Sequence, residues 1–174
     1  TSWRGLFVIL AAIDGLILLA TALWLRETLP AERRQASGAS AAAFGRLLRD
    51  RFFLAYAAVL GLSFAALFSY IAGSSFVLEG VYGLSPQLYG AVFGLNAFGI
   101  IVCSQANRLF VGRLSPQQLL FAGVAAQAAG GVTLLAVVLA GGIGLPGILP
   151  CLFVVVAFIG MAMPNASALA MTDY

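Results

Sequence analysis

The 174-residue chain contains no histidine and only two cysteines, Cys103 and Cys151. Histidine is the commonest metal ligand and general base, and two cysteines within apolar runs provide neither a metal-ligand spacing nor a disulfide framework. The sequence also shows no paired carboxylates and no nucleophile beside a base, which a membrane enzyme would need. It therefore predicts no catalytic residues, no metal and no cofactor, and it argues against an enzyme.

Charged side chains are also scarce. They make up 9% of the chain, against 62% hydrophobic residues, and the mean hydropathy is +1.04. A soluble domain has roughly 25% charged residues, so this chain has too little polar surface to coat a water-soluble globule. The net charge of +3 gives no indication of nucleic-acid binding, because the arginines lie in short polar segments. We therefore expect an integral membrane protein surrounded by the lipid bilayer.

Five apolar runs are long enough to cross a hydrocarbon core of about 30 Å as helices. They cover residues 5–25, 52–77, 88–110, 119–140 and 148–171. The segments 78–87 and 141–147 between them contain glycine and proline and have no arginine, so we expect them to be external loops. The predicted fold class is all-α, a polytopic α-helical membrane protein with five transmembrane helices.

The one long polar segment, residues 26–51, lies between the first and second apolar runs. It holds six of the nine arginines: Arg26, Arg33, Arg34, Arg46, Arg49 and Arg51. The turn 108–116 contains two more, which leaves only Arg4 elsewhere. Arginine-rich loops stay on the cytoplasmic side. We therefore expect both segments to be cytoplasmic, with the first helix entering from outside.

Asp14 lies near the middle of the first apolar run. A carboxylate at that depth costs about 2.5–3.5 kcal/mol on insertion scales, so it normally faces protein or a water-filled cavity. One interpretation is a protonatable or substrate-facing intramembrane group. The other is an aspartate tolerated beside water or small neighbours. No cation lies in the middle of an apolar run, because Arg108 is near the end of the third run, so a partner would come from elsewhere.

Uncharged polar and aromatic side chains mark further candidate positions. Phe64, Phe68 and Ile71 share one helix face, a pattern more often explained by packing than by ligand contact. Asn96 and Gln105 point to opposite sides of the third run. Each is either an interhelical hydrogen-bonding group, which is the safer interpretation, or a cavity-lining group.

Small residues and a proline predict where helices pack or bend. Gly90 and Gly94 form a GxxxG pair that would let another helix approach closely. The fourth run has a similar small-residue face, made of Gly123, Gln127, Gly130 and Gly131. Pro164 lies inside the fifth run, where its missing N–H predicts a kink.

Four motifs resemble one branch of a known transporter family. They are SWRGLF (2–7), RETLPAERR (26–34), SYIAGSSFVLEGVYGLSPQLYGAVFGLNAFG (69–99) and PNASALAM (164–171). They are similar to the bicyclomycin-resistance (Bcr/CflA) drug:proton antiporters of the major facilitator superfamily. The segment 69–99 is the most specific, whereas ETLP-x-x-R recurs in many related transporters. Two departures are Ser75, where the family usually has proline, and Asp14, where a small apolar residue is expected.

The resemblance implies that the five runs are family helices six to ten. Residues 1–25 would be the last helix of the N-terminal half, residues 26–51 the cytoplasmic loop between the halves, and residues 52–174 the first four helices of the C-terminal half. The remainder of the N-terminal half and the last two helices would then be missing partners. We expect a bacterial inner membrane protein.

The implied activity is multidrug efflux by alternating access, driven by the proton gradient and acting on amphipathic small-molecule drugs. The residues that would line the substrate cavity are Phe64, Phe68, Tyr70, Asn96 and Asn165. An alternative is a truncated, non-transporting membrane remnant or interaction module.

Overall fold

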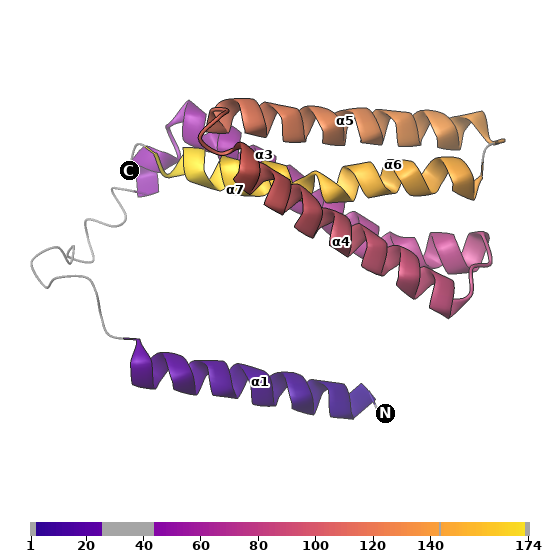
Figure 1. Ribbon diagram of the computed structural model, residues 1–174, viewed down its shortest axis with the longest axis horizontal. Helices are drawn as coiled ribbons and strands as arrows, with labels where there is room; N and C mark the ends of the chain where they lie inside the picture. The colour runs from indigo at the N-terminus through magenta and orange to yellow at the C-terminus, as the bar shows by residue number, and fades with distance from the viewer. Residues whose placement is uncertain (1–2, 26–43, 143, 173–174) are drawn as a thin grey trace, which may run out of the picture. The chain divides into compact units, whose positions relative to one another are not determined.

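The computed structural model describes residues 3–25, 44–142 and 144–172 (Figure 1). Most of the predicted basic segment, including Arg26, Arg33 and Arg34, lies outside these residues, as do residues 173–174. The chain divides into two compact units, Thr1–Phe44 and Gly45–Tyr174, which we describe separately. The helices are α1 (Trp3–Trp24), α3 (Arg51–Ser75), the π-helix η2 (Phe76–Val81), α4 (Pro86–Phe110), α5 (Pro116–Ala140), α6 (Leu145–Ala157) and α7 (Ile159–Ala170).

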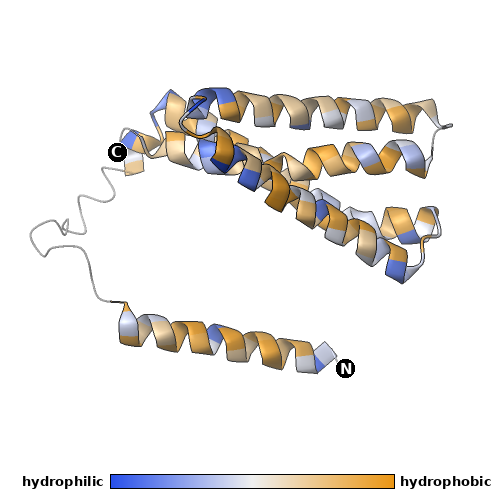
Figure 2. Ribbon diagram, in the orientation of Figure 1, coloured by the Kyte–Doolittle hydropathy of each residue, from blue (hydrophilic) through white to orange (hydrophobic). Residues whose placement is uncertain are grey.

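Five spans of the described chain are long and apolar enough to cross a membrane, which confirms the predicted fold class. They are Trp3–Trp24, Arg51–Val81, Pro86–Phe110, Pro116–Ala140 and Leu145–Ala170. Apolar residues run along each helix and the hydrophilic ones gather mainly near the ends (Figure 2). Each observed span overlaps one predicted run and differs from it by a few residues at either end.

Capping residues explain where three of the helices begin. The Asp50 carboxylate accepts hydrogen bonds from the first-turn N–H groups of α3. Ser85 and Ser115 cap α4 and α5, and a proline follows each serine at the first helical position. Gln118 completes a capping box with Ser115. These ends are therefore encoded locally in the sequence.

In the second unit, the fifth span lies among the other three. Both of its segments pack against α4 and α5, whereas α3 packs mainly against α7 (Figure 1). A cluster of Leu120, Ala162, Ala166 and Leu169 joins α5 to α7, with α3 residues packed against it. The fifth span is accordingly the most buried: 44% of its apolar window is buried, against 6–11% for the spans of α3, α4 and α5.

Glycines mark the closest helix contacts in this bundle. A Cβ atom at Gly160 of α7 would collide with the carbonyl oxygen of Ile100 on α4. At Gly123 of α5 it would stand 3.0 Å from the backbone nitrogen of Ala162. Gly99 and Gly130 face α6 with similarly little space. The prediction of close packing along α5 is thus confirmed at Gly123 and Gly130.

No helix of the described chain packs closely on the GxxxG pair. A Cβ atom at Gly90 or at Gly94 would meet nothing within 4 Å. The close approach on α4 occurs instead at Gly99, which lies on the face that α6 covers. Sequence spacing identified the small residues, but it did not show which face of α4 packs within this bundle.

Two local features also differ from the predictions. The fifth span is interrupted at Phe158 (φ −72°, ψ −7°), and α7 remains helical through Pro164, so the kink expected at that proline stays a prediction. Proline opposes helical geometry in the turn that precedes it, and the interruption lies six residues before it. In the predicted loop 78–87, η2 extends the helix to Val81, and the reversal follows at Gly83 (φ 68°).

Candidate functional site

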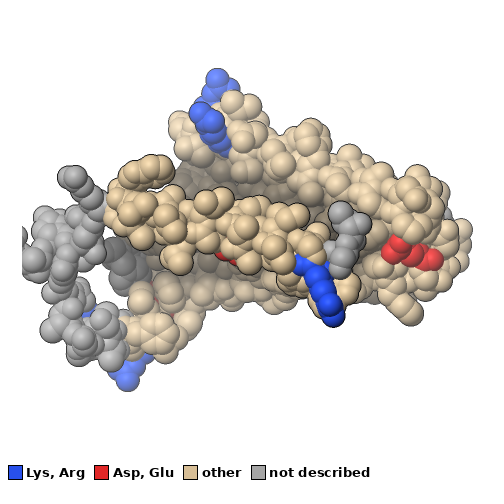
Figure 3. Space-filling model, turned by 90° about the horizontal axis from the view of Figure 1, so that it is seen from below, with Lys and Arg blue, Asp and Glu red and all other residues tan. Residues whose placement is uncertain are grey.

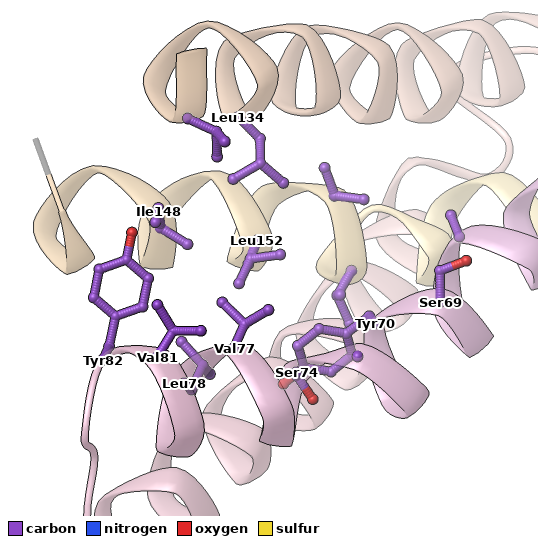
Figure 4. A pocket seen from close by; sticks show the side chains of 15 residues that line it. Ser69, Tyr70, Ser74, Val77, Leu78, Val81, Tyr82, Leu134, Ile148 and Leu152 are labelled. Atoms are coloured by element: carbon purple, nitrogen blue, oxygen red, sulfur yellow. The ribbon is translucent and has the colours of Figure 1, made fainter. Parts of the chain in front are cut away.

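A groove of about 560 Å³ lies between α3 with η2 on one side and α5 with α6 on the other (Figure 4). Tyr82 and Ile148 lie at one end of it and Ser69 at the other. Its lining is almost entirely apolar. The lining residues are Ala66, Ser69, Tyr70, Gly73, Ser74, Val77, Leu78, Val81, Tyr82, Leu134, Val138, Ile148, Leu152, Val155 and Val156.

The wider turns of η2 change the direction in which the following side chains point, and so determine which of them line the end of this groove. Phe64 and Tyr82 are about five α-helical turns apart, so a continuous α-helix would place them on the same face. In η2 the turns are wider, as the bond from the Tyr82 N–H to the Val77 carbonyl shows. Tyr82 therefore lines the groove. The sequence contained no signal for this shift.

Tyr70 is fixed at the wall of the groove by α4. The Asn96 amide donates a hydrogen bond to the Tyr70 hydroxyl over 2.8 Å, and the Tyr70 ring stacks on Phe93 at 5.6 Å. The hydroxyls of Ser74 and Tyr89 form a second link between α3 and α4 at 3.1 Å. These contacts hold the groove-facing side of α3 against α4.

Phe64 and Phe68 lie on the other side of α3. Their rings stack with centroids 6.4 Å apart, and the side chains are 44% and 62% exposed. Tyr70 is two residues beyond Phe68, which corresponds to a rotation of about 200° around the helix. The predicted cavity residues on α3 thus belong to two surfaces, the groove and an exposed aromatic face.

The two predicted asparagines are buried between helices. The Asn165 amide of α7 donates to Asn107 of α4 over 2.6 Å and to the Met161 carbonyl over 2.7 Å. Asn96 is 2% exposed and Asn165 is 4% exposed. Interhelical hydrogen bonding was the safer interpretation of Asn96, and the structure shows that bond. Gln105, in contrast, is exposed.

A further amide lies between α3 and α5. The Ser63 hydroxyl donates to the Gln127 amide oxygen over 3.3 Å. The amide nitrogen of Gln127 is buried and has no hydrogen-bond partner in the described chain. This polar contact adds a link between helices and does not form a site with the groove.

Charged groups lie near the ends of the helices of the second unit and away from the groove. Arg108 and Arg113 are exposed at the turn between α4 and α5, while Glu79 lies at the other end, bonded to Ser75. Figure 3 shows few Lys, Arg, Asp or Glu side chains among the described residues of the two units. Asp14 lies in the middle of α1 and is exposed there. The described residues contain no group of three or more potential metal ligands.

These surfaces can hold an apolar partner by shape and stacking. Among the described residues, the groove wall contributes hydroxyl groups, and the amides of Asn96 and Asn165 are buried between helices. Together with the five apolar spans, these surfaces define a polytopic α-helical membrane protein with a helix-bundle fold.

The chain belongs to the major facilitator superfamily, whose family model matches residues 1–174. It is 35% identical over 173 residues to an uncharacterized MFS-type transporter, YdgK, of Bacillus subtilis (strain 168); the match covers 98% of this chain and 42% of that protein. It is 30% identical over 134 residues to the multidrug resistance protein MdtL of Salmonella heidelberg (strain SL476), with 76% and 33% covered. The chain thus spans less than half the length of these relatives.

Proposed function

We propose that these residues form part of a multidrug efflux drug:proton antiporter. The observation that supports this most directly is the exposed, stacked pair Phe64 and Phe68 near the middle of a membrane span. Aromatic surface at that depth suits amphipathic drugs, which bind by stacking and apolar contact. The 30% identity to a protein named for multidrug resistance agrees with this substrate class.

The proposed cycle is alternating access in a bacterial inner membrane, with segment 26–51 on the cytoplasmic side. Two helix bundles would rock about a substrate site near the midplane, and Phe64 and Phe68 would line the path between them. Tyr70, Asn96 and Asn165 would act mainly by fixing α3, α4 and α7, because their polar groups already bond within the bundle.

A chimera tests the drug site. In it, the 174 residues replace the aligned part of the Bacillus subtilis relative, and ethidium accumulation is measured in cells that lack their own exporters. We expect Phe64→Ala with Phe68→Ala to raise ethidium accumulation, since the stacking surface is lost. Phe121→Ala, which removes a 76% exposed ring on α5, is the matched control and should leave accumulation unchanged. Equal accumulation in all forms, with equal amounts in the membrane, contradicts the proposed site.

We propose that Asp14 is the intramembrane group that binds and releases the proton during the transport cycle. It is an acidic residue at the centre of a membrane span. In the same chimera, Asp14→Asn should abolish export driven by a pH gradient, whereas Asp14→Glu should retain part of it. If Asp14→Asn still exported ethidium when driven by a pH gradient, Asp14 would not be the proton-binding group. It would then be an aspartate tolerated beside water or small neighbours.

A non-transporting remnant is the second candidate, because the chain spans 42% of the Bacillus subtilis relative. Expressing the 174 residues alone beside the chimera separates the possibilities. We expect export only from the chimera. Export by the 174 residues alone would contradict the requirement for two bundles, and export by neither form would favour the remnant.

A further inference from the structure

We infer that a water molecule is bound where the fifth span is interrupted at Phe158, between the Gln127 amide of α5 and the backbone carbonyl of Val155. Phe158 lies near the middle of the span Leu145–Ala170, and Gln127 lies near the middle of Pro116–Ala140. The site is therefore deep in the membrane. It is built from hydrogen bonds and packing within the second unit and does not depend on drug export.

The backbone bonds at the interruption supply the first argument. In a continuous α-helix the Ile159 N–H would bond the Val155 carbonyl, four residues earlier. Phe158 still bonds the Val154 carbonyl, whereas Met161 donates to Phe158, only three residues away. Between these described residues, the α-helical bond from Ile159 to Val155 is not formed. Backbone groups freed in this way inside a membrane span are satisfied by neighbouring side chains or by ordered water.

The contacts of two glycines place Gln127 opposite this interruption. A Cβ atom at Gly123 would stand 3.0 Å from the Ala162 nitrogen, and one at Gly130 would stand 3.0 Å from the Val155 side chain. Gln127 lies one turn from each glycine and on the same face of α5. It therefore faces the stretch between Val155 and Ala162. A helical carbonyl points toward the C-terminal end of its helix, so the Val155 carbonyl is directed into the same stretch.

The hydrogen bonds of the Gln127 amide supply the third argument. Its oxygen accepts from the hydroxyl of Ser63 on α3 over 3.3 Å, and Ser63 is 4% exposed. Its nitrogen is buried and has no partner among the described residues. Gln127 is thus a donor that needs an acceptor, while Val155 offers an acceptor without its helical donor. One water molecule serves both, because it accepts from the amide and donates to the carbonyl.

Water suits this position better than a cation or an organic ligand. The amide nitrogen presents N–H groups, which are donors and cannot coordinate a cation. An organic ligand would need an opening to the amide, but that nitrogen is buried. The Gln127 side chain as a whole is only partly buried, so its rotatable bonds allow it to adjust around a molecule as small as water. The bound water allows the span to be interrupted at a depth where lipid offers no hydrogen bonds.

Solid-state NMR in lipid vesicles tests this inference without measuring transport. Magnetisation transfer from water protons is followed to the Gln127 side-chain nitrogen and to the Val155 carbonyl carbon in the Bacillus subtilis chimera. We expect early transfer to both atoms. The Ala126 carbonyl, within the unbroken helix α5, is the reference and should receive none at the same mixing time. Absence of transfer to Gln127 or to Val155 would overturn the inference.

Two variants test whether Gln127 holds the water. Gln127→Met keeps a side chain of similar length but removes the donor, so the transfer to the Val155 carbonyl should be lost. Ser63→Ala removes the bond at the other end of the same amide and is the matched control, in which that transfer should persist. Transfer to Val155 that survives Gln127→Met would overturn the inference, because water would then reach the interruption without this side chain. An equal loss in both variants would also overturn it. If Gln127→Met does not reach the membrane, the measurement on the unaltered chimera decides the question by itself.

Discussion

The two segments of the fifth span pack in different ways although they continue one another. In α7, seven of twelve residues are buried, and the helix meets α3, α4 and α5. In α6, four of thirteen residues are buried, and the groove separates much of this helix from α3. Small residues such as Gly160, Ala162 and Ala166 allow the backbones to meet around α7. The larger side chains of α6, among them Leu152 and Val155, form a surface that the described chain covers only in part. Side-chain size therefore determines where the bundle is tightly closed.

The largest effect is expected at Gly160. Gly160→Val should lower the free energy of unfolding by about 3 kcal/mol, because the added atoms collide with backbone that cannot move aside. Reversible unfolding in mixed micelles measures this change. Gly131→Val, at an open position, should stay within about 0.5 kcal/mol. If the two variants lowered the free energy of unfolding by similar amounts, the distinction between tightly packed and open glycine positions would be wrong.

Asn165 should have an intermediate effect. Asn165→Ala removes the amide that bonds both Asn107 and the Met161 carbonyl. Met161 precedes Asn165 by one turn on α7, so only the bond to Asn107 links two helices. Interhelical hydrogen bonds in membranes contribute about 0.6 kcal/mol on average and up to about 1.7. The loss should fall near the upper value, because the buried Asn107 amide oxygen also loses this donor. Gln105→Ala removes an exposed amide from α4 and is the control, with no measurable change expected. If Asn165→Ala did not change the free energy of unfolding, close packing at the glycines would be sufficient to keep α7 against its neighbouring helices.

The smallest effect is expected at Tyr70. Tyr70→Phe keeps the ring that stacks on Phe93 but removes the acceptor for the buried Asn96 amide. We expect a loss of about 0.6 kcal/mol, the average for an interhelical hydrogen bond in a membrane, measured in the same unfolding assay. Tyr82→Phe should have no effect, since the Tyr82 side chain is 38% exposed. If Tyr82→Phe lowered the free energy of unfolding more than Tyr70→Phe, contacts at the Tyr82 end of the groove would stabilise the bundle more than the contact of α3 with α4.

Much of the fold could be predicted from the sequence because apolar runs of sufficient length have few alternatives to membrane helices. The buried amides were also identifiable, since amides within a span need partners. Which face of a helix packs was less accessible, as Gly90 and Gly94 show. The register shift at η2 and the interruption at Phe158 have no counterpart in the apolar pattern of the sequence. The two-residue spacing already places Phe68 and Tyr70 on different sides of α3, but only the structure shows that the side of Tyr70 faces the groove. Their roles in transport stay predictions.

Cysteine cross-linking tests the contrast between the closed and open parts of the bundle most directly. In the 174-residue chain without native cysteines, Gly130→Cys with Val154→Cys joins positions on α5 and α6 whose Cβ atoms would lie 3.4 Å apart, close to the separation found in disulfides. Val77→Cys with Leu152→Cys places thiols on opposite walls of the groove. We predict rapid disulfide formation for the first pair and little for the second. A second pair that forms its disulfide as fast as the first, or a first pair that fails to form one, would contradict the account.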